Sequence, residues 1–127
     1  MELPQNLKYT QSHEWIADHG DGTVTVGITA VAAEQLGDLV YVELPPVGAR
    51  VERGANCAVV ESTKAAAEVY APVGGEVVAA NAELSAHPEQ VNASPYGGGW
   101  LFKLKLADRA ELDALLSRDA YAKSAGV

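Results

Sequence analysis

The element that governs the architecture is the stretch Val59-Val60-Glu61-Ser62-Thr63-Lys64-Ala65-Ala66-Ala67-Glu68-Val69-Tyr70. Apolar residues stand at both of its ends, and Lys64 lies near its middle. Gly54 precedes Lys64 by ten residues, and Gly74 follows it by ten. An apolar strand, a polar tip and a second apolar strand between glycines are typical of a β-hairpin that presents one residue to solvent.

Local composition favours a different structure at the same place. Residues 64–68 are good helix formers. A helix there would span about one turn and would lack an apolar stripe, and isolated helices of that length are marginal. We therefore predict a hairpin with Lys64 at its exposed tip.

Alternation with a period of two predicts three further strands, over residues 23–28, 40–44 and 102–106. Their expected inward side chains are Val24, Val26 and Ile28; Val40, Val42 and Leu44; and Phe102, Leu104 and Leu106. Turn composition at residues 19–22 predicts a hairpin before the first of these strands. Pro45 ends the second, because proline cannot donate to a ladder. Many short strands separated by Gly and Pro indicate an all-β sandwich or barrel.

Two segments have helical signals instead. Thr29 is placed to cap a helix over residues 30–36, which Gly37 would close. Asp108 and Glu111 form a capping-box pattern that predicts a second helix, with its leucines on one side.

Size and charge exclude several classes of protein. The chain has 127 residues, 48% of them hydrophobic, and no linker or repeat divides it, so we expect one domain over residues 1–127 with a core at about 7–121 and a frayed end at 122–127. The 17 acidic and 9 basic residues give a net charge of −8, which argues against nucleic-acid binding and membrane-surface attachment. One cysteine, Cys57, lies in an apolar run and is expected to be a small buried residue in a reducing compartment.

No catalytic or metal-ligating pattern stands out. The three histidines lack the spacing of metal ligands, the serines lack a hydrolase frame, and residues 97–99 form a glycine turn that no strand and helix enclose. Lys64 is then the candidate of interest, because a lysine amine on an exposed turn can be acylated by another enzyme. The alternative is an ordinary solvated lysine.

A series of short motifs runs through the chain. Glu61-Ser62-Thr63-Lys64-Ala65 is followed by Val69-Tyr70-Ala71-Pro72 and Gly74-Gly75-Glu76-Val77. The others, in order, are His13-Glu14-Trp15, Val26-Gly27-Ile28-Thr29, Leu36-Gly37-Asp38, Val42-Glu43-Leu44-Pro45, Val91-Asn92 and Pro95-Tyr96-Gly97-Gly98-Gly99-Trp100. This series resembles the glycine cleavage system H protein family, and the motif around Lys64 is similar to its lipoylation site. The resemblance covers nearly the whole chain.

The resemblance implies an all-β fold, a barrel-sandwich hybrid of the lipoyl/biotinyl-carrier type with short peripheral helices and a C-terminal helix. It implies lipoate bound covalently to Lys64 and no enzyme activity of the chain's own. The expected partners are glycine decarboxylase (P protein), which loads an aminomethyl group, aminomethyltransferase (T protein), which removes it, and dihydrolipoamide dehydrogenase (L protein), which reoxidises the dithiol. Lipoylating enzymes are further expected partners. The chain is expected to be a monomer.

Two glutamates are further candidates, Glu61 from its place on the predicted tip and Glu14 from the resemblance. Glu61 would assist recognition by the lipoylating enzyme, because its carboxylate would lie on the same tip as the target amine. Glu14 would contact the loaded arm in a cleft as a polar partner for the amine, and a surface strand carboxylate is the alternative. Gln35 stands where family members can have a histidine, so that contact would be altered here.

Other functions use the same fold. A biotinyl carrier has methionine on both sides of its lysine, whereas Thr63 and Ala65 flank Lys64. The lipoyl domain of a 2-oxo acid dehydrogenase, an H-like protein that relays lipoate, and an interaction module with an unmodified lysine are the remaining alternatives. The N-terminus has no secretory signal and no apolar run approaches about 20 residues, so we expect a bacterial cytoplasmic protein, or a mitochondrial one if the chain is a processed eukaryotic form.

Overall fold

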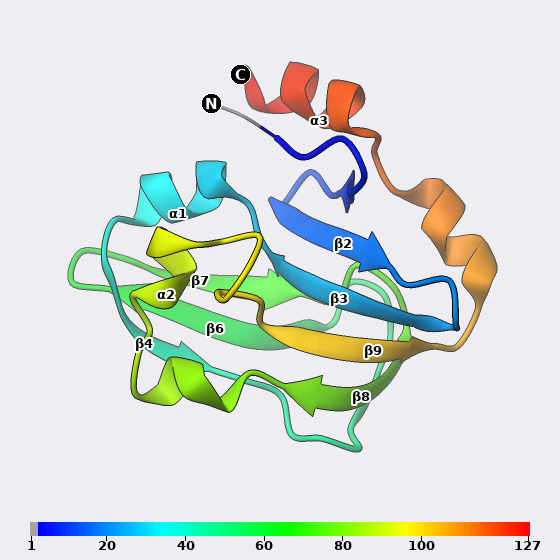
Figure 1. Ribbon diagram of the computed structural model, residues 1–127, viewed down its shortest axis with the longest axis horizontal. Helices are drawn as coiled ribbons and strands as arrows, with labels where there is room; N and C mark the ends of the chain where they lie inside the picture. The colour runs from blue at the N-terminus through cyan, green and yellow to red at the C-terminus, as the bar shows by residue number, and fades with distance from the viewer. Residues whose placement is uncertain (1–2) are drawn as a thin grey trace.

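The computed structural model describes residues 3–127, which form two antiparallel β-sheets with short helices at their edges (Figure 1). The strand order is β1-β2-β3-β9-β8-β5 in the larger sheet and β4-β6-β7 in the smaller one. The strands are β1 (Lys8–Tyr9), β2 (Glu14–Asp18), β3 (Thr23–Ile28), β4 (Leu39–Glu43), β5 (Arg50–Val51), β6 (Asn56–Ser62), β7 (Ala66–Tyr70), β8 (Gly75–Ala80) and β9 (Phe102–Leu106). The helices are α1 (Ala30–Leu36), α2 (Gln90–Ala93) and α3 (Arg118–Ala125), with 3₁₀ helices η1 (Ala82–Ser85) and η2 (Arg109–Ala114). This architecture confirms the expected all-β fold.

The strand predictions are confirmed where the apolar residues alternate without interruption. β3 and β9 cover the predicted residues and pair with each other, Val24 opposite Leu104 and Val26 opposite Phe102. β2 and β3 form the predicted hairpin around residues 19–22. β4 ends at Glu43, before the prolines.

The prediction that Val40 points inward is wrong. Val40 is 55% exposed, whereas Leu39 and Val42 are buried. The register between β4 and β6 shifts between Leu39 and Tyr41. A bulge of this kind adds a residue and breaks the alternation, so Leu39 takes the inward position that Val40 was expected to fill.

The first predicted helix is confirmed and the second is not. Thr29 caps α1 by accepting a hydrogen bond from the backbone N–H of Ala32. After Asp108 the chain forms η2, a 3₁₀ helix that ends before Leu115. The C-terminal helix is α3, which Ser117 caps and which contains residues 118–125, so the expected frayed end at 122–127 is in fact helical up to residue 125.

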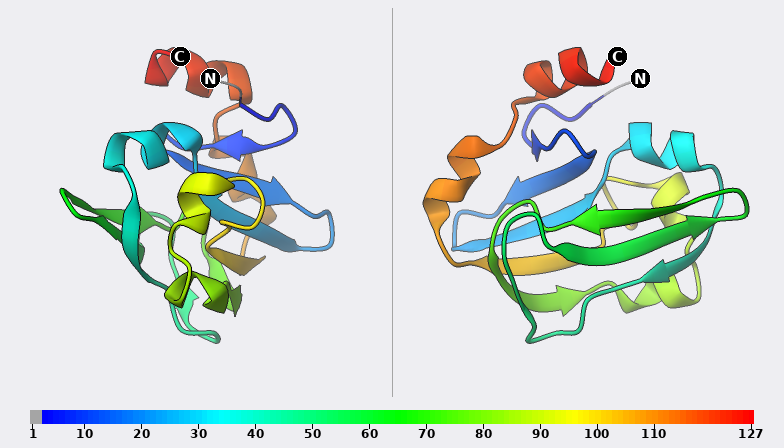
Figure 2. Two further views of the ribbon diagram at one scale, coloured as in Figure 1. Left: turned by 60° about the vertical axis from the view of Figure 1, so that its left-hand side comes forward. Right: turned by 180° about the vertical axis from the view of Figure 1, so that it is seen from behind.

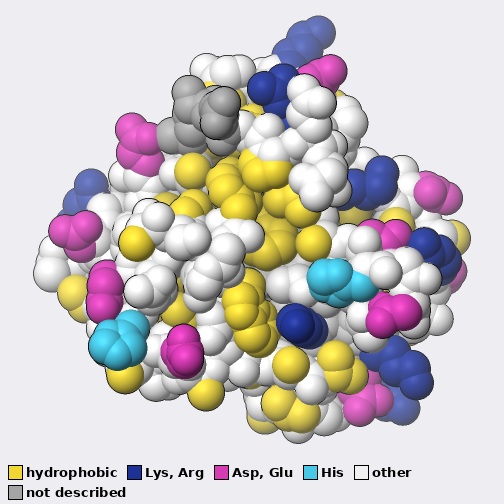
Figure 3. All heavy atoms as spheres, viewed as in Figure 1, with side chains coloured by type: hydrophobic (Ala, Val, Ile, Leu, Met, Phe, Trp, Pro, Cys, Tyr) yellow, Lys and Arg dark blue, Asp and Glu magenta, His cyan; other side chains and the backbone are white. Residues whose placement is uncertain are grey.

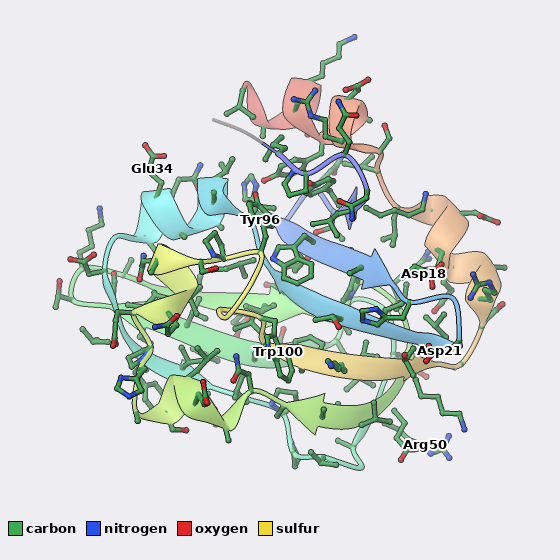
Figure 4. All side chains as sticks on the ribbon, in the orientation of Figure 1. Asp18, Asp21, Glu34, Arg50, Tyr96 and Trp100 are labelled. Carbon is green, nitrogen blue, oxygen red and sulfur yellow. The ribbon has the colours of Figure 1, made fainter. Side chains whose placement is uncertain are left out.

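Two apolar clusters hold these elements together. The larger cluster lies between the sheets and includes Val24, Phe102 and Leu104 from one and Val60 and Val69 from the other. The second cluster joins the N-terminal segment, β2, α1 and α3; its buried members are Leu3, Tyr9, Trp15, Val31 and Tyr121. Figure 3 shows apolar side chains gathered across the middle of one face, where Figure 4 places the half-buried Tyr96 and Trp100 that pack against this second cluster. Within residues 3–127, no helix has the length and apolar character needed to cross a membrane.

Candidate functional site at the tip of the β6–β7 hairpin

The β6–β7 hairpin projects from the body and turns at Thr63 and Lys64 (Figure 2). Glu61 lies opposite Ala66, and the backbone N–H of Ser62 donates to the carbonyl of Ala65 over 2.8 Å. The Ser62 hydroxyl accepts from the backbone N–H groups of Lys64 (3.3 Å) and Ala65 (3.1 Å). The structure thus confirms the hairpin over the helix that local composition favours, with Lys64 exposed at its tip.

Ser62 is a residue whose role the sequence analysis missed. Its hydroxyl accepts hydrogen bonds from the backbone N–H groups of the turn, as serine hydroxyls commonly do. A serine two residues before the exposed lysine could have indicated this.

The Lys64 amine forms no ion pair with any residue from 3 to 127, although two glutamates lie near it in the sequence. Within residues 3–127 the ion pairs join His87 with Glu89, Arg109 with Asp18 and Arg118 with Asp119. Glu61 and Glu68, the two glutamates nearest to Lys64 in sequence, are in none of these pairs. The amine is therefore available for chemistry with another protein.

Glu61 lies on the outer face of the smaller sheet. It is half-buried in β6, between its cross-strand neighbours Tyr41 in β4 and Ala66 in β7. Directly opposed residues of paired strands share a face. Glu61 therefore lies close to the tip, on a strand that a partner reaching Lys64 would meet.

Glu14 is the first residue of β2 and lies beside Tyr70, at the end of β7 away from the tip. It is almost fully buried, with 1% of its surface exposed. One carboxyl oxygen accepts from the hydroxyls of Thr10 (2.5 Å) and Ser12 (2.6 Å). The other accepts a longer bond from the backbone N–H of Tyr70, at 3.4 Å. The interpretation of Glu14 as a surface carboxylate is therefore wrong, because the turn before β2 folds over it.

Glu14 borders a cavity of about 520 Å³, which Ser12, Arg53 and Tyr70 also line. A second cavity, of about 480 Å³, lies along β7 beside Ala66 and Glu68 and also reaches Tyr70. The Tyr70 hydroxyl donates to Glu68 over 3.2 Å. Tyr70 thus borders both cavities, one beside the residues that follow Lys64 and the other beside Glu14. The sequence analysis gave no role to Ser12 or Tyr70.

Cys57 and Gln35 are the remaining residues that the sequence singles out. Cys57 is half-buried in β6, so the expectation of a fully buried cysteine is wrong. Burial raises the pKa of its thiol to about 11, so the thiol is protonated at neutral pH. Gln35 is exposed on α1. No group of three His, Cys, Asp or Glu side chains within residues 3–127 is arranged to hold a metal ion.

Comparison with known proteins matches residues 7–126 to the model of the glycine cleavage H-protein family. The chain belongs to this family. A glycine cleavage system H protein of Pseudoalteromonas translucida is 55% identical over 122 residues, which cover 96% of this chain and 95% of that protein. One of Laribacter hongkongensis is 56% identical over 124 residues, 98% of each chain. A crystal structure of such a protein from Mycobacterium marinum has a TM-score of 0.90 at 42% identity and covers 98% of this chain and 100% of its own.

Membership of the glycine cleavage H-protein family confirms the resemblance on which the sequence analysis relied. The solved H protein also confirms the barrel-sandwich fold, because its structure superposes on nearly the whole chain.

Proposed function

We propose that this member of the glycine cleavage H-protein family is a lipoyl carrier that bears lipoate in amide linkage on Lys64 and catalyses no reaction itself. The observation that carries the proposal is an exposed lysine at the tip of a hairpin, without an ion pair among residues 3–127, in a chain of this family. The tip has room for a lipoyl group: Ala65 and Ala66 add little bulk next to Lys64, and a cavity lies along β7 beside Ala66.

Lys64 would hold lipoate, which would supply a reducible disulfide able to carry an aminomethyl group. The partners would be glycine decarboxylase (P protein), aminomethyltransferase (T protein) and dihydrolipoamide dehydrogenase (L protein), the last of which would return the dithiol form to the disulfide. The chain's own residues hold and present the lipoate. The Ser62 bonds fix the turn, and the sheet beneath keeps the attachment point in place. A tethered group reaches each docked partner at high effective concentration without diffusing away. The charge of −8 favours encounters with basic partner surfaces.

We further propose that Glu14 is a contact for the amine of the loaded arm. Its support is a buried carboxyl group beside a cavity, with one oxygen held by two hydroxyls and the other engaged only by a long bond. That second oxygen has capacity to accept from a cationic amine.

The domain and its location complete the proposal. The carrier consists of one domain, in which the sheets and α3 share two apolar clusters. It works in a bacterial cytoplasm as a monomer, in keeping with the bacterial origin of its relatives.

Mixing the lipoylated chain with glycine decarboxylase should support exchange of bicarbonate into the carboxyl group of glycine, whereas an interaction module would support none.

The modification of Lys64 gives the first prediction. Incubation with a lipoate ligase, lipoate and ATP should raise the intact mass by one lipoyl increment, because one amine is presented on the recognised tip. Lys64→Arg should abolish the increment, since a guanidinium is not acylated. Lys8→Arg, an exposed lysine of β1, is the matched control and should leave it unchanged. An increment that persists in Lys64→Arg, or an unmodified parent chain, would contradict the proposal.

Recognition by the lipoylating enzyme gives the second prediction. Glu61→Ala should slow lipoylation by about tenfold, which corresponds to the loss of about 1.4 kcal/mol of binding to the enzyme. Initial rates from mass spectrometry measure the effect. Glu83→Ala removes an exposed glutamate from η1 and should leave the rate unchanged. Equal rates for the two variants, with unchanged unfolding curves, would count against recognition through Glu61.

A further inference from the structure

The exposed side chain of Lys64 lies beside Gly37, the residue that ends α1. A Cβ atom at residue 37 would lie 3.3 Å from Cε and 3.7 Å from Nζ of Lys64. Gly37 has φ +83° and ψ −166°, a backbone conformation that essentially only glycine adopts. The last methylene and the amine of the lysine thus lie where a side chain at residue 37 would begin, and only a glycine leaves that space open.

The turn at Gly37 is itself held in place by Asn92 of α2. The Asn92 side-chain amide donates to the carbonyl oxygens of Gly37 (2.9 Å) and Ala33 (3.4 Å). Its side-chain oxygen accepts from the backbone N–H of Leu39 over 2.9 Å. One side chain therefore bonds the backbone on both sides of Asp38, which fixes the whole turn.

The three parts come from distant places in the sequence and meet at one end of the molecule. Figure 1 shows α1 above α2, with the β6–β7 hairpin reaching the same end of the molecule. Figure 2 shows the hairpin tip beside the segment that leads from α1 to β4. Helix α1 ends at Gly37 and thereby brings it beside Lys64.

We propose that the Gly37 turn, held by Asn92, is a seat for the root of the arm on Lys64, and that Gly37 and Asn92 are positioning residues for it. The inference rests on the proposed function for its biological meaning. When Nζ becomes an amide nitrogen, the arm starts from a point above Gly37. The seat limits the torsions of the lysine and so selects the directions in which the arm leaves the protein.

The seat can be tested in the unmodified chain. Nuclear Overhauser contacts between the ε protons of Lys64 and the α protons of Gly37 should be present. They should disappear in Asn92→Asp, which keeps the acceptor for Leu39 but places a carboxylate against the carbonyl of Gly37. Absence of the contacts in the parent chain overturns the proposal, whether or not Lys64 is lipoylated, and a parent chain that shows them but cannot be lipoylated leaves the seat standing while it refutes the carrier function.

The lipoylated chain offers a matched pair of glycine variants. Gly37→Ala places a methyl group against Lys64 in a backbone with φ +83°, whereas Gly48→Ala meets a similar strain, at φ +94°, with no atom within 4 Å. Both should lose stability. Gly37→Ala alone should raise the KM of glycine decarboxylase for the carrier by about threefold at unchanged kcat. Without the seat, one side-chain torsion of Lys64 can populate all three of its staggered wells, so only about a third of the carriers hold the arm in the orientation that the enzyme binds. An equal KM for the two variants, at a temperature where both are folded, overturns the proposal.

Discussion

At the scale of single residues, Glu14 shows best what burial adds to a sequence pattern. The sequence left two interpretations open, because a glutamate at the start of a strand can face either solvent or a cleft. The structure buries it under the hydroxyls of Thr10 and Ser12. That burial depends on a turn in which His13 adopts φ +72°, a conformation uncommon for residues other than glycine and one that no pattern in the sequence indicates.

The proposed role of Glu14 makes a prediction about cargo retention. Glu14→Gln keeps an acceptor for the two hydroxyls but removes the charge that favours a cationic amine, so the chain should fold normally. The carrier loaded with its aminomethyl group should then release ammonia about tenfold faster in the absence of the transferase, equivalent to about 1.4 kcal/mol. The assay is the time course of free ammonia after removal of the partner enzymes.

The matched control for this prediction is Glu43→Gln, because Glu43 is an exposed glutamate of β4 that does not line the cavity beside Glu14. It should release ammonia at the parent rate. A Glu14→Gln carrier that retains its cargo as long as the parent would show that the carboxyl group has a structural role only.

At the scale of elements, the sequence predicted well those segments whose signals are local. β3, β9 and α1 each contain an unbroken alternation or a cap followed by a glycine. The prediction of a helix after Asp108 failed where a distant segment competes for a side chain. Asp108 does cap its own turn, by accepting from Ala110 over 3.0 Å, but Glu111 accepts from the backbone N–H of Gly74 over 2.7 Å. A contact across 37 residues cannot be read from a capping motif.

This bond gives a prediction about how η2 is anchored. Glu111→Ala should lower the free energy of unfolding by about 1–3 kcal/mol, the cost of leaving a buried donor such as Gly74 without its partner. Glu111→Gln should recover part of the loss, because its side-chain oxygen can still accept. Asp113→Ala, an exposed residue of the same 3₁₀ helix, should change the stability little. Urea unfolding distinguishes these outcomes, and equal losses in Glu111→Ala and Asp113→Ala would refute the anchoring role.

The residues of the candidate site also fall into two groups, those that local patterns predict and those that only tertiary packing places. Lys64, Glu61 and the hairpin follow from a local pattern and from the family motif. Asn92 lies in α2, a four-residue helix that has no side-chain cap and that the sequence analysis did not anticipate. Its three partners, Ala33, Gly37 and Leu39, lie more than 50 residues away in sequence. Tertiary packing, and not local propensity, places this residue.

At the scale of the whole molecule, Tyr121 of α3 joins the C-terminal helix to the body. The buried ring stacks on Tyr9 with centroids 4.8 Å apart. Its hydroxyl lies 2.6 Å from Nδ1 of His13 and 2.7 Å from the hydroxyl of Thr29, the cap of α1. The C-terminal helix therefore bonds to the turn over Glu14 and to the helix that leads to Gly37, so both parts of the proposed site depend on it.

Tyr121→Phe keeps the stacking but removes the hydroxyl, and should lower the free energy of unfolding by about 1–3 kcal/mol, because His13 and Thr29 lose a partner in a buried place. Tyr41→Phe, at a position that is 50% exposed, should change it little. Burial raises the pKa of the Tyr121 hydroxyl, so the folded chain holds this proton more tightly than the unfolded chain. The contribution is complete below the ordinary tyrosine pKa of about 10 and is lost as the pH rises through the higher folded value. Urea unfolding from pH 7 to pH 11 should therefore show that the difference in free energy of unfolding between the parent chain and Tyr121→Phe becomes smaller above about pH 10. A difference that grows above pH 10 would contradict a raised pKa for the Tyr121 hydroxyl in the folded chain.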